Sequence, residues 1–297
     1  MNKSIVIGAN GYLGRHLAFF LKEAGFDNRN YDLQKLPLLG VDCYSPIDIA
    51  EKQSFEKLDP AVDYIFFFAG LSGTSDGFSK YEDFNRVNEL GLLNMLTWMK
   101  EKQCRARIVF PSTRLIYKGK KGQPLKEDDA KETRTIYAVN KLAAENILWA
   151  YQNAFGIDYT IFRICVPYGN CFDDLFSYGT IGFFLDKARK QEPIMLFGDG
   201  SLRRTFTHVE DICRIIISGV KNDKTKNDVF NIGGETLSLM EVAQIVAEKF
   251  NTEVKFSAWP ELAARIESGD TIFDDGKLRK LGLVHYNENL SGWISSI

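Results

Sequence analysis

Apolar residues along the chain form short continuous runs, and these alternate with longer stretches in which apolar residues recur every three or four positions. The continuous runs are rich in β-branched and aromatic residues and predict buried strands at 3–9, 62–70, 106–113 and 158–169. The periodic stretches predict amphipathic helices at 14–25, 88–103 and 136–156. Strands separated by helices require crossover connections, so this order predicts an α/β fold with a parallel sheet covered on both faces.

The alternation becomes irregular after about residue 170, where loops, short strands and helices mix. No internal repeat, low-complexity linker or clean break marks a boundary. We therefore expect a smaller second lobe at 171–297 that folds against a first domain at 1–170, with some of its segments returning to that domain.

Three glycines, Gly8, Gly11 and Gly14, stand between the first predicted strand and the first predicted helix. Glycine permits the tight turn there and lets backbone N–H groups approach a pyrophosphate at the start of the helix. Asp32 follows at the roughly 20-residue spacing of a carboxylate that accepts hydrogen bonds from the adenine ribose, and it would repel a 2′-phosphate. A structural turn and a solvated acid are the alternatives; the position in the fold favours a dinucleotide site for NAD rather than NADP.

A tyrosine and a lysine, Tyr137 and Lys141, occupy positions i and i+4 of a predicted helix and therefore share one face. An ammonium group beside the phenol would lower the tyrosine pKa from about 10 and make Tyr137 usable as an acid or base. Ser112 and Thr113 end a predicted strand, where a hydroxyl lies beside a dinucleotide site. Alone, the pair could be an ordinary helix surface. Together with the glycine turn and Thr113, the pair indicates that Tyr137 and Lys141 act in acid–base catalysis.

Composition narrows the class of protein. The chain has 297 residues and a net charge of −2, which gives no reason to expect nucleic acid or a membrane surface as a partner. No apolar run approaches the roughly 20 residues that a membrane-spanning helix needs. The five cysteines lack metal-type spacing, and His16, His208 and His285 are scattered, so we expect reduced thiols, no metal site and a cytoplasmic protein.

Taken together, these motifs resemble the extended short-chain dehydrogenase/reductase family, in its nucleotide-sugar epimerase/dehydratase branch, over nearly the whole chain. The stretches that carry the resemblance are "GANGYLG", "SPIDIAEKQSF", "FFFAG", "RVNELGLLNML", "PSTRLIY", "YAVNK" and "FGDGSLRRTFTHVEDI". The resemblance implies a Rossmann-type sheet that binds NAD at 1–170 and a mainly substrate-binding lobe at 171–297.

The resemblance also implies roles for individual residues. The catalytic residues would be Thr113, Tyr137 and Lys141, with Tyr137 taking a proton from a sugar hydroxyl while hydride passes to the nicotinamide. The cofactor would be bound by Gly8, Asn10, Gly11, Tyr12, Leu13, Gly14, Asp32, Asp48, Ile49, Phe68, Ala69, Gly70, Asn88, Ser112, Tyr137, Lys141 and Val166. The substrate, a nucleotide-diphosphate sugar, would be bound by Thr113, Asn170, Arg204, Arg265 and Asp270.

Departures from the family pattern narrow the reaction. Dehydratases of this branch place an Asp–Glu pair directly after the catalytic threonine, where this chain has Arg114 and Leu115. Neither side chain exchanges a proton usefully at neutral pH, so a dehydratase is not expected. Asp32 favours NAD and hence a 4-epimerase. A 4-keto-sugar reductase and a non-catalytic NAD-sensing protein remain the alternatives. The stretches "MLTWMK" and "NILWAYQ" lie on helices that commonly form a dimer interface in this family, which implies a homodimer.

Overall fold

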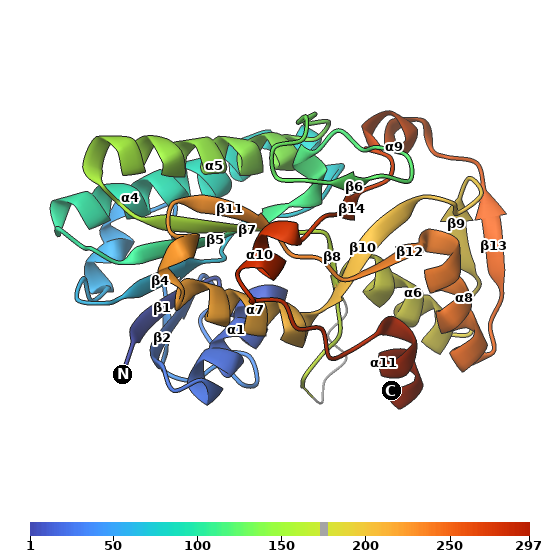
Figure 1. Ribbon diagram of the computed structural model, residues 1–297, viewed down its shortest axis with the longest axis horizontal. Helices are drawn as coiled ribbons and strands as arrows, with labels where there is room; N and C mark the ends of the chain where they lie inside the picture. The colour runs from blue at the N-terminus through green and yellow to red at the C-terminus, as the bar shows by residue number, and fades with distance from the viewer. Residues whose placement is uncertain (173–177) are drawn as a thin grey trace.

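A computed structural model describes residues 1–172 and 178–297 of the molecule. In these residues, seven parallel strands form a central sheet (Figure 1). From one edge to the other, the order of the strands is β11 (Asp228–Asn231), β7 (Tyr159–Ile164), β5 (Arg107–Thr113), β4 (Tyr64–Phe67), β1 (Lys3–Ile7), β2 (Asp27–Asp32) and β3 (Tyr44–Pro46). The order reverses between β1 and β4. Ligands of open α/β sheets bind beyond the carboxyl ends of the strands at such a point.

Helices cover both faces of this sheet (Figure 1). One face carries α4 (Gly91–Glu101) and α5 (Ile136–Phe155), and the other carries α1 (Tyr12–Glu23) and α7 (Val209–Val220). Each face has its own apolar core, since alternate residues of a strand point to opposite sides. Ile5 and Ile7 of β1 face α4 and α5, whereas Val6 packs toward α1 and α7. The predicted α/β Rossmann-type fold is thus confirmed.

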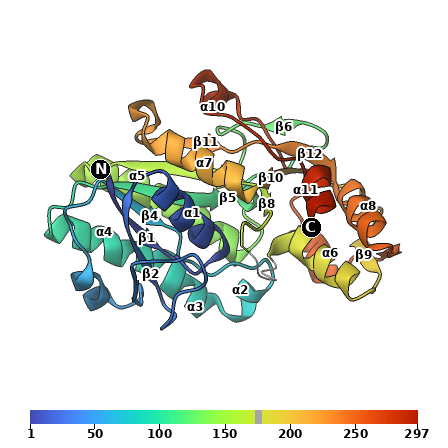
Figure 2. The ribbon, with the colours of Figure 1, turned by 90° about the horizontal axis from the view of Figure 1, so that it is seen from below.

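A smaller lobe lies beside the carboxyl ends of the strands, as Figure 2 shows from below. Its helices are α6 (Gly179–Arg189), α8 (Leu239–Phe250), α9 (Glu261–Ile266) and α11 (Leu290–Ser296). Its strands are β8 (Val166–Tyr168), β10 (Arg203–His208) and β12 (Glu235–Ser238) in one sheet, and β9 (Ile194–Phe197) and β13 (Val254–Ser257) in another. A third apolar core fills this lobe.

Shorter elements lie between the helices and strands given above. They are η1 (Lys52–Lys57), α2 (Asp76–Ser79), α3 (Tyr81–Asn85), the π-helical turn η2 (Arg86–Leu90), η3 (Arg114–Ile116), β6 (Pro124–Leu125), η4 (Asp223–Thr225), β14 (Ile272–Phe273) and α10 (Gly276–Lys280). Strand β14 pairs with β6, so the last part of the chain is joined to the segment that follows β5. In the described residues no helix is both long and apolar enough to cross a membrane.

The chain changes sheets within the single strand predicted at 158–169. Strand β7 ends at Ile164 in the large sheet, and β8 begins at Val166 in the small sheet, where it pairs with β10. Both pieces are buried and apolar, so their pattern alone gave no sign of the change. Similarly, α7 and β11 come from the second half of the sequence, but β11 pairs with β7 and α7 packs in the same core as α1.

Candidate active site

The turn between β1 and α1 leaves no room for side chains. Gly8 has a φ of +93°, and a Cβ atom there would lie 2.3 Å from the backbone nitrogen of Ala69. A Cβ atom on Gly14 would lie 2.0 Å from the Gly8 carbonyl oxygen. The N-cap Gly11 makes no side-chain hydrogen bond to the helix. The start of an α-helix attracts an anion through its N–H groups and its dipole.

Asp32 stands at the carboxyl end of β2 beside this turn. One of its carboxylate oxygens accepts a 3.0 Å hydrogen bond from the backbone of Asn10, and the other accepts a 2.7 Å bond from the backbone of Leu33. These bonds fix the carboxylate at the rim of a cavity of about 260 Å³. The lining of this cavity includes Gly8, Asn10, Gly11, Asp32, Asp48, Ile49, Phe68, Ala69 and Gly70.

The side chain of Asn10 supports the loop that follows β2. Its Nδ2 donates to the Gln34 side chain at 3.1 Å and to the Leu36 carbonyl at 2.9 Å, and its Oδ1 accepts from the Leu38 backbone at 2.9 Å. The amide group is therefore used by the protein itself. Asn10 shapes the edge of the cavity through this loop and through its backbone bond to Asp32.

Asn88 performs a similar task after β4. Within the π-helical turn η2, its Oδ1 accepts from the Leu71 N–H at 2.7 Å and its Nδ2 donates to the Leu71 carbonyl at 3.0 Å. A Cβ atom on Gly70 would lie 3.0 Å from that Oδ1. Asn88 therefore holds the backbone of Leu71, which lines the cavity directly after Gly70.

A second cavity, of about 160 Å³, continues from the glycine turn toward α5. Its lining includes Gly11, Tyr12, Leu13, Gly14, Ser112, Tyr137, Lys141 and Tyr178. Thr135 caps α5, because its hydroxyl accepts a 3.1 Å bond from the Ala138 N–H, and the cap places Tyr137 in the first turn. The hydroxyl of Ser112 is buried and has no hydrogen-bond partner in the described part of the chain.

Burial sets the protonation of the tyrosine and the lysine. It raises the pKa of Tyr137, and a hydrogen bond with the Thr113 side chain opposes this rise. Burial also lowers the pKa of Lys141 to about 7. The Lys141 Nζ donates to the Pro111 carbonyl at 2.7 Å and lies 4.3 Å from the centre of the Phe110 ring. The prediction that Lys141 lowers the pKa of Tyr137 is therefore wrong for the protein without a ligand. Desolvation is the largest cause of the pKa shift of both groups.

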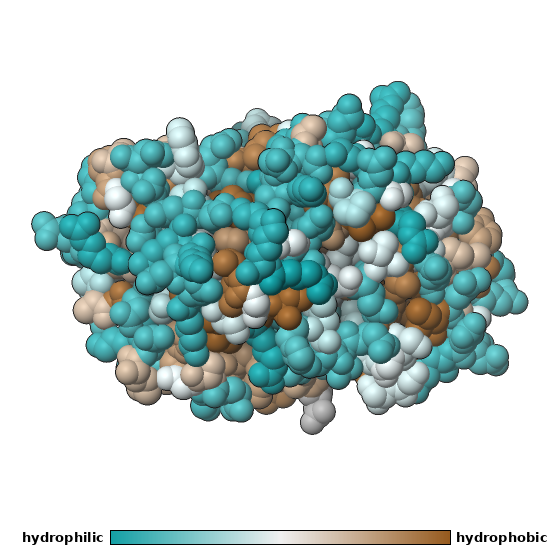
Figure 3. All heavy atoms as spheres, viewed as in Figure 1, coloured by the Kyte–Doolittle hydropathy of each residue, from teal (hydrophilic) through white to brown (hydrophobic). Residues whose placement is uncertain are grey.

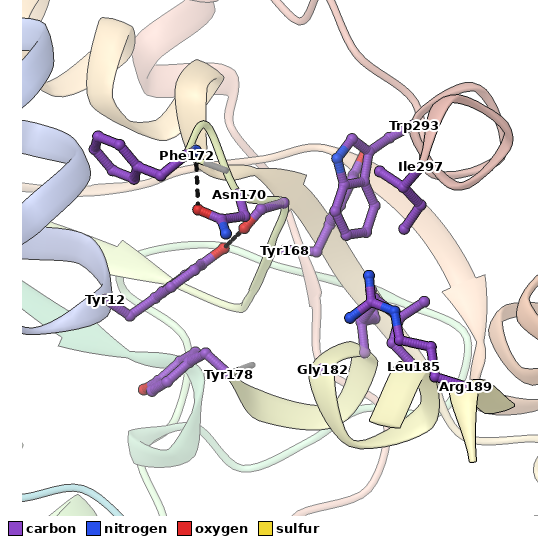
Figure 4. A pocket seen from close by; sticks show the side chains of 12 residues that line it. Tyr12, Tyr168, Asn170, Phe172, Tyr178, Gly182, Leu185, Arg189, Trp293 and Ile297 are labelled. Atoms are coloured by element: carbon purple, nitrogen blue, oxygen red, sulfur yellow. Dashed lines mark hydrogen bonds between the residues drawn. The ribbon is translucent and has the colours of Figure 1, made fainter. Parts of the chain in front are cut away.

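Tyr12 separates this cavity from a third one, of about 100 Å³ (Figure 4). Its hydroxyl donates to the Gly169 carbonyl at 2.7 Å, and its ring stacks on Tyr178 with centroids 4.6 Å apart. Asn170 lines the third cavity and accepts a 3.2 Å bond from the Phe172 backbone. The structure thus places Asn170 away from the other predicted substrate residues. No motif in the sequence indicated that Tyr178 lies here.

A fourth cavity, of about 470 Å³, lies between the two lobes and contains Arg204. The Arg204 guanidinium donates to Glu267 at 2.9 Å, and burial together with the neighbouring Arg114 lowers its pKa to about 10. Apolar side chains form much of the wall, namely Phe183, Phe184, Met195, Leu196, Phe197, Leu239 and Trp259. A charged end and an apolar body suit a ligand that carries both an anionic group and a ring.

Five predicted residues are absent from the linings of these cavities. Thr113 and Asn88 stand next to lining residues in the chain, namely Ser112 and Val87, and the other three are Arg265, Asp270 and Val166. Arg265 is on the exposed side of α9, where it pairs with Glu261. Asp270 is buried, and its two oxygens accept from the backbones of Arg203 and Gly122, both at 2.8 Å. Val166 is 6% exposed and packs in the core of the smaller lobe. The structure brings none of the three to the lining of the cavities that hold Tyr137 or Arg204.

The two adjoining cavities fit a dinucleotide. Glycines leave space for a pyrophosphate at the start of α1, and Asp32 stands where a ribose hydroxyl could donate to it. Ser112, whose hydroxyl has no hydrogen-bond partner among the described residues, lines the second cavity. The face of the molecule in Figure 3 is mostly hydrophilic, with apolar residues in small patches. The fold and the site together define a Rossmann-type protein with a dinucleotide site next to a tyrosine–lysine pair.

Comparison with known proteins identifies the family. Residues 4–233 match the NAD dependent epimerase/dehydratase family, and the chain belongs to that family. It is 29% identical to the UDP-N-acetyl-alpha-D-glucosaminuronate decarboxylase of Bacillus cytotoxicus, over 85% of this chain and 82% of that protein. It is 28% identical to the UDP-glucuronate 4-epimerase of Thermodesulfobacterium geofontis, over 86% and 83% of the two chains.

Solved structures show the same fold. The UDP-glucose 4-epimerase of Thermus thermophilus, in complex with NAD, superimposes with a TM-score of 0.86. The alignment covers 99% of this chain and 96% of that chain at 21% identity. The resemblance stated from the sequence motifs is thereby confirmed at the level of the family and the fold.

Proposed function

We propose that this protein is an NAD-dependent nucleotide-sugar epimerase that inverts a sugar carbon, with C4 as the position. The observation that carries the proposal is that Tyr137 and Lys141 line the same cavity as the glycine turn. This arrangement brings a proton-transferring group to the end of a dinucleotide site. The activities named for the relatives, a 4-epimerase and a decarboxylase of UDP-sugars, support a nucleotide-sugar substrate.

In this proposal, protein side chains transfer and stabilise the proton of the sugar hydroxyl. NAD, when bound, supplies the acceptor and donor of hydride and a positive charge on its oxidised ring. Tyr137 takes the proton from the sugar hydroxyl as that carbon is oxidised, and gives it back as the carbon is reduced from its other face. A positive charge entering the cavity lowers the pKa of Tyr137 that burial has raised. Thr113 holds the same oxygen, and Lys141 holds the ribose beside it.

The acidic residue at the end of β2 supports NAD as the cofactor. Asp32 is fixed by two backbone hydrogen bonds at the rim of the cavity that lies next to the glycine turn. A carboxylate there accepts hydrogen bonds from ribose hydroxyls and repels a phosphate in their place. A cofactor that stays bound and is regenerated in each cycle suits an epimerase better than a reductase.

We also propose a homodimer in a reducing compartment such as the cytoplasm. The described cysteines are all free thiols. On α5 the side chain of Trp149 is 62% exposed, which supports a contact along this helix, whereas Trp98 of α4 is 1% exposed and belongs to the core. A dimer contact on this side would therefore use α5 rather than the tryptophan of α4.

The test is the identity and amount of nucleotide released when the purified protein is denatured. The epimerase proposal expects near-stoichiometric NAD, and conversion of a UDP-sugar to its C4 epimer without added cofactor. Protein that is isolated empty and oxidises one NADPH per sugar would instead identify a 4-keto-sugar reductase. Bound NAD without turnover of any nucleotide sugar would identify an NAD-sensing protein.

A further inference from the structure

Two buried arginines lie together in the 470 Å³ cavity between the lobes. Arg204 is 6% exposed and comes from β10. Arg114 is 8% exposed and immediately follows Thr113 at the end of β5. Both line the cavity together with Glu267. Two guanidinium groups that share a buried space repel each other, so their proximity needs a reason.

Among the described residues, one ion pair with a carboxylate reaches these two arginines. Glu267 pairs with Arg204 at 2.9 Å, and the oxygens of Asp270 are occupied by backbone N–H groups. Arg114 donates only to the hydroxyls of Ser268 and Thr271, at 3.3 and 3.4 Å, and makes no ion pair among the described residues.

Arg204 also keeps an unused donor. Its Nε is buried and has no hydrogen-bond partner in the residues that the structure describes. Buried charges are normally paired, and a partnerless guanidinium donor beside a cavity therefore points to an anion from outside the chain. A phosphate suits this position because the planar fork of arginine donates two parallel bonds to it.

The second arginine expected from the sequence does not reach this place. The side chain of Arg265 is 74% exposed and forms an ion pair with Glu261 on its own helix. Arg114, which the sequence placed only as a departure from the dehydratase pattern, stands next to Arg204 instead. The structure therefore assigns the second cationic position to a different element of the fold.

We propose that Arg114 and Arg204 form a clamp that binds the diphosphate of the nucleotide sugar, an inference that rests on the proposed function. Arg114 directly follows Thr113 in the chain. The residue that binds the diphosphate is therefore next to the residue whose hydroxyl binds the reacting sugar oxygen. The substrate is thus positioned from both ends by consecutive residues of one strand end.

The test is binding of nucleoside diphosphates by calorimetry to wild type and to Arg114→Gln. UDP, dTDP, CDP and GDP are screened, and the tightest is compared with its nucleoside. The clamp predicts that Arg114→Gln weakens the diphosphate by about ten- to a hundredfold and leaves the nucleoside unchanged. The matched control is Arg265→Gln, which removes an exposed guanidinium nearby and is expected to bind like wild type.

A second variant guards against a folding defect. Arg114→Lys keeps the charge but loses the fork, so it should fold as wild type does and bind with intermediate affinity. Equal binding by wild type and Arg114→Gln, or equal losses in Arg114→Gln and Arg265→Gln, would overturn the clamp. A loss seen with UDP-glucuronate but not with UDP would also overturn it, and would assign Arg114 to a sugar carboxylate.

This result is separable from the proposed reaction. Diphosphate binding is measured without turnover, whereas the epimerase proposal is judged by bound NAD and product. If wild type binds none of the four diphosphates but contains NAD, the clamp fails while the dinucleotide site stands. If the two arginines bind a nucleoside diphosphate but no nucleotide sugar is converted, only the proposed epimerase reaction is contradicted.

Discussion

Lys141 donates a 2.7 Å hydrogen bond from its Nζ to the carbonyl oxygen of Pro111, which ties helix α5 to strand β5. Pro111 directly precedes Ser112 and Thr113. The bond therefore holds the proposed catalytic lysine in register with the two hydroxyls at the strand end. It also explains why a buried amine is tolerated, because one of its donors is satisfied inside the protein.

The lowered pKa of Lys141 predicts a pH dependence of stability. Burial moves this pKa from 10.5 to about 7. Between these values the unfolded chain carries a proton that the folded chain lacks, so this group makes the free energy of unfolding rise with pH. Lys141→Met should remove that rise. Urea unfolding of both proteins from pH 7 to pH 10 measures it, and parallel pH profiles would contradict the prediction.

Removal of the Tyr137 hydroxyl should abolish proton transfer without loss of the cofactor. We expect Tyr137→Phe to lower kcat by roughly 10²–10⁴-fold and to retain the wild-type amount of bound NAD. The control is Tyr178→Phe, whose ring lines the same cavity and stacks on Tyr12. An equal loss in both variants would show that the cavity, rather than the Tyr137 hydroxyl, had been damaged.

Asp32 should determine the choice of cofactor. Asp32→Asn keeps the size of the side chain but removes the charge at the rim of the cavity. The preference for NAD over NADP, measured as a ratio of dissociation constants, should fall by about tenfold or more. Asp48→Asn changes a neighbouring carboxylate in the same cavity and serves as the control. An unchanged ratio in Asp32→Asn would remove the basis for assigning NAD.

Two glycines with similar backbone conformations allow a test of the turn. Gly8 and Gly25 have φ values of +93° and +78°, but a Cβ atom meets the backbone of Ala69 at Gly8 and nothing within 4 Å at Gly25. Gly25→Ala should cost about 1–2 kcal/mol from conformation alone. Gly8→Ala should cost at least about 2 kcal/mol more, as judged by thermal unfolding. Equal costs would mean that the turn relaxes freely.

A buried ion pair lies one turn beyond Lys141 on α5. Arg163 donates to both oxygens of Glu145, at 2.9 and 2.6 Å, and both side chains are buried. Glu145→Ala leaves a buried guanidinium without its partner and should cost about 3–5 kcal/mol in chemical unfolding. The exposed pair of Asp186 and Lys190 provides the contrast, since Asp186→Ala should cost no more than about 1 kcal/mol.

The sequence predicted the parts of the site that depend on local spacing. The glycine turn, the spacing of Asp32 from it, and the shared face of Tyr137 and Lys141 follow from neighbours in the chain. Strand β2 itself was not predicted, because its "DNRNYD" is polar although its end is buried. Its polar side chains bond to one another, as Asn28 does to Asn30 at 2.7 Å, which hydropathy does not reveal.

Features that depend on contacts between distant segments were not predictable. Arg114 lines the cavity with Arg204, whereas Arg265 is exposed and pairs with Glu261. Neither position follows from neighbours in the sequence. The direction of the Tyr137 pKa shift likewise depends on burial by residues far along the chain. The sequence shows that Arg114 departs from the family pattern. Only the structure shows which residues the Arg114 side chain contacts.

Strand β11 has a consequence for how the protein is made. It pairs with β7 at the edge of the large sheet, and α7 covers α1, yet both elements follow much of the smaller lobe in the sequence. While a ribosome is still translating that lobe, the emerging first domain lacks its outer strand and one covering helix, so apolar surface near β7 stays uncovered. We therefore expect cotranslational folding to pause at a partly closed intermediate that binds chaperones until β11 emerges.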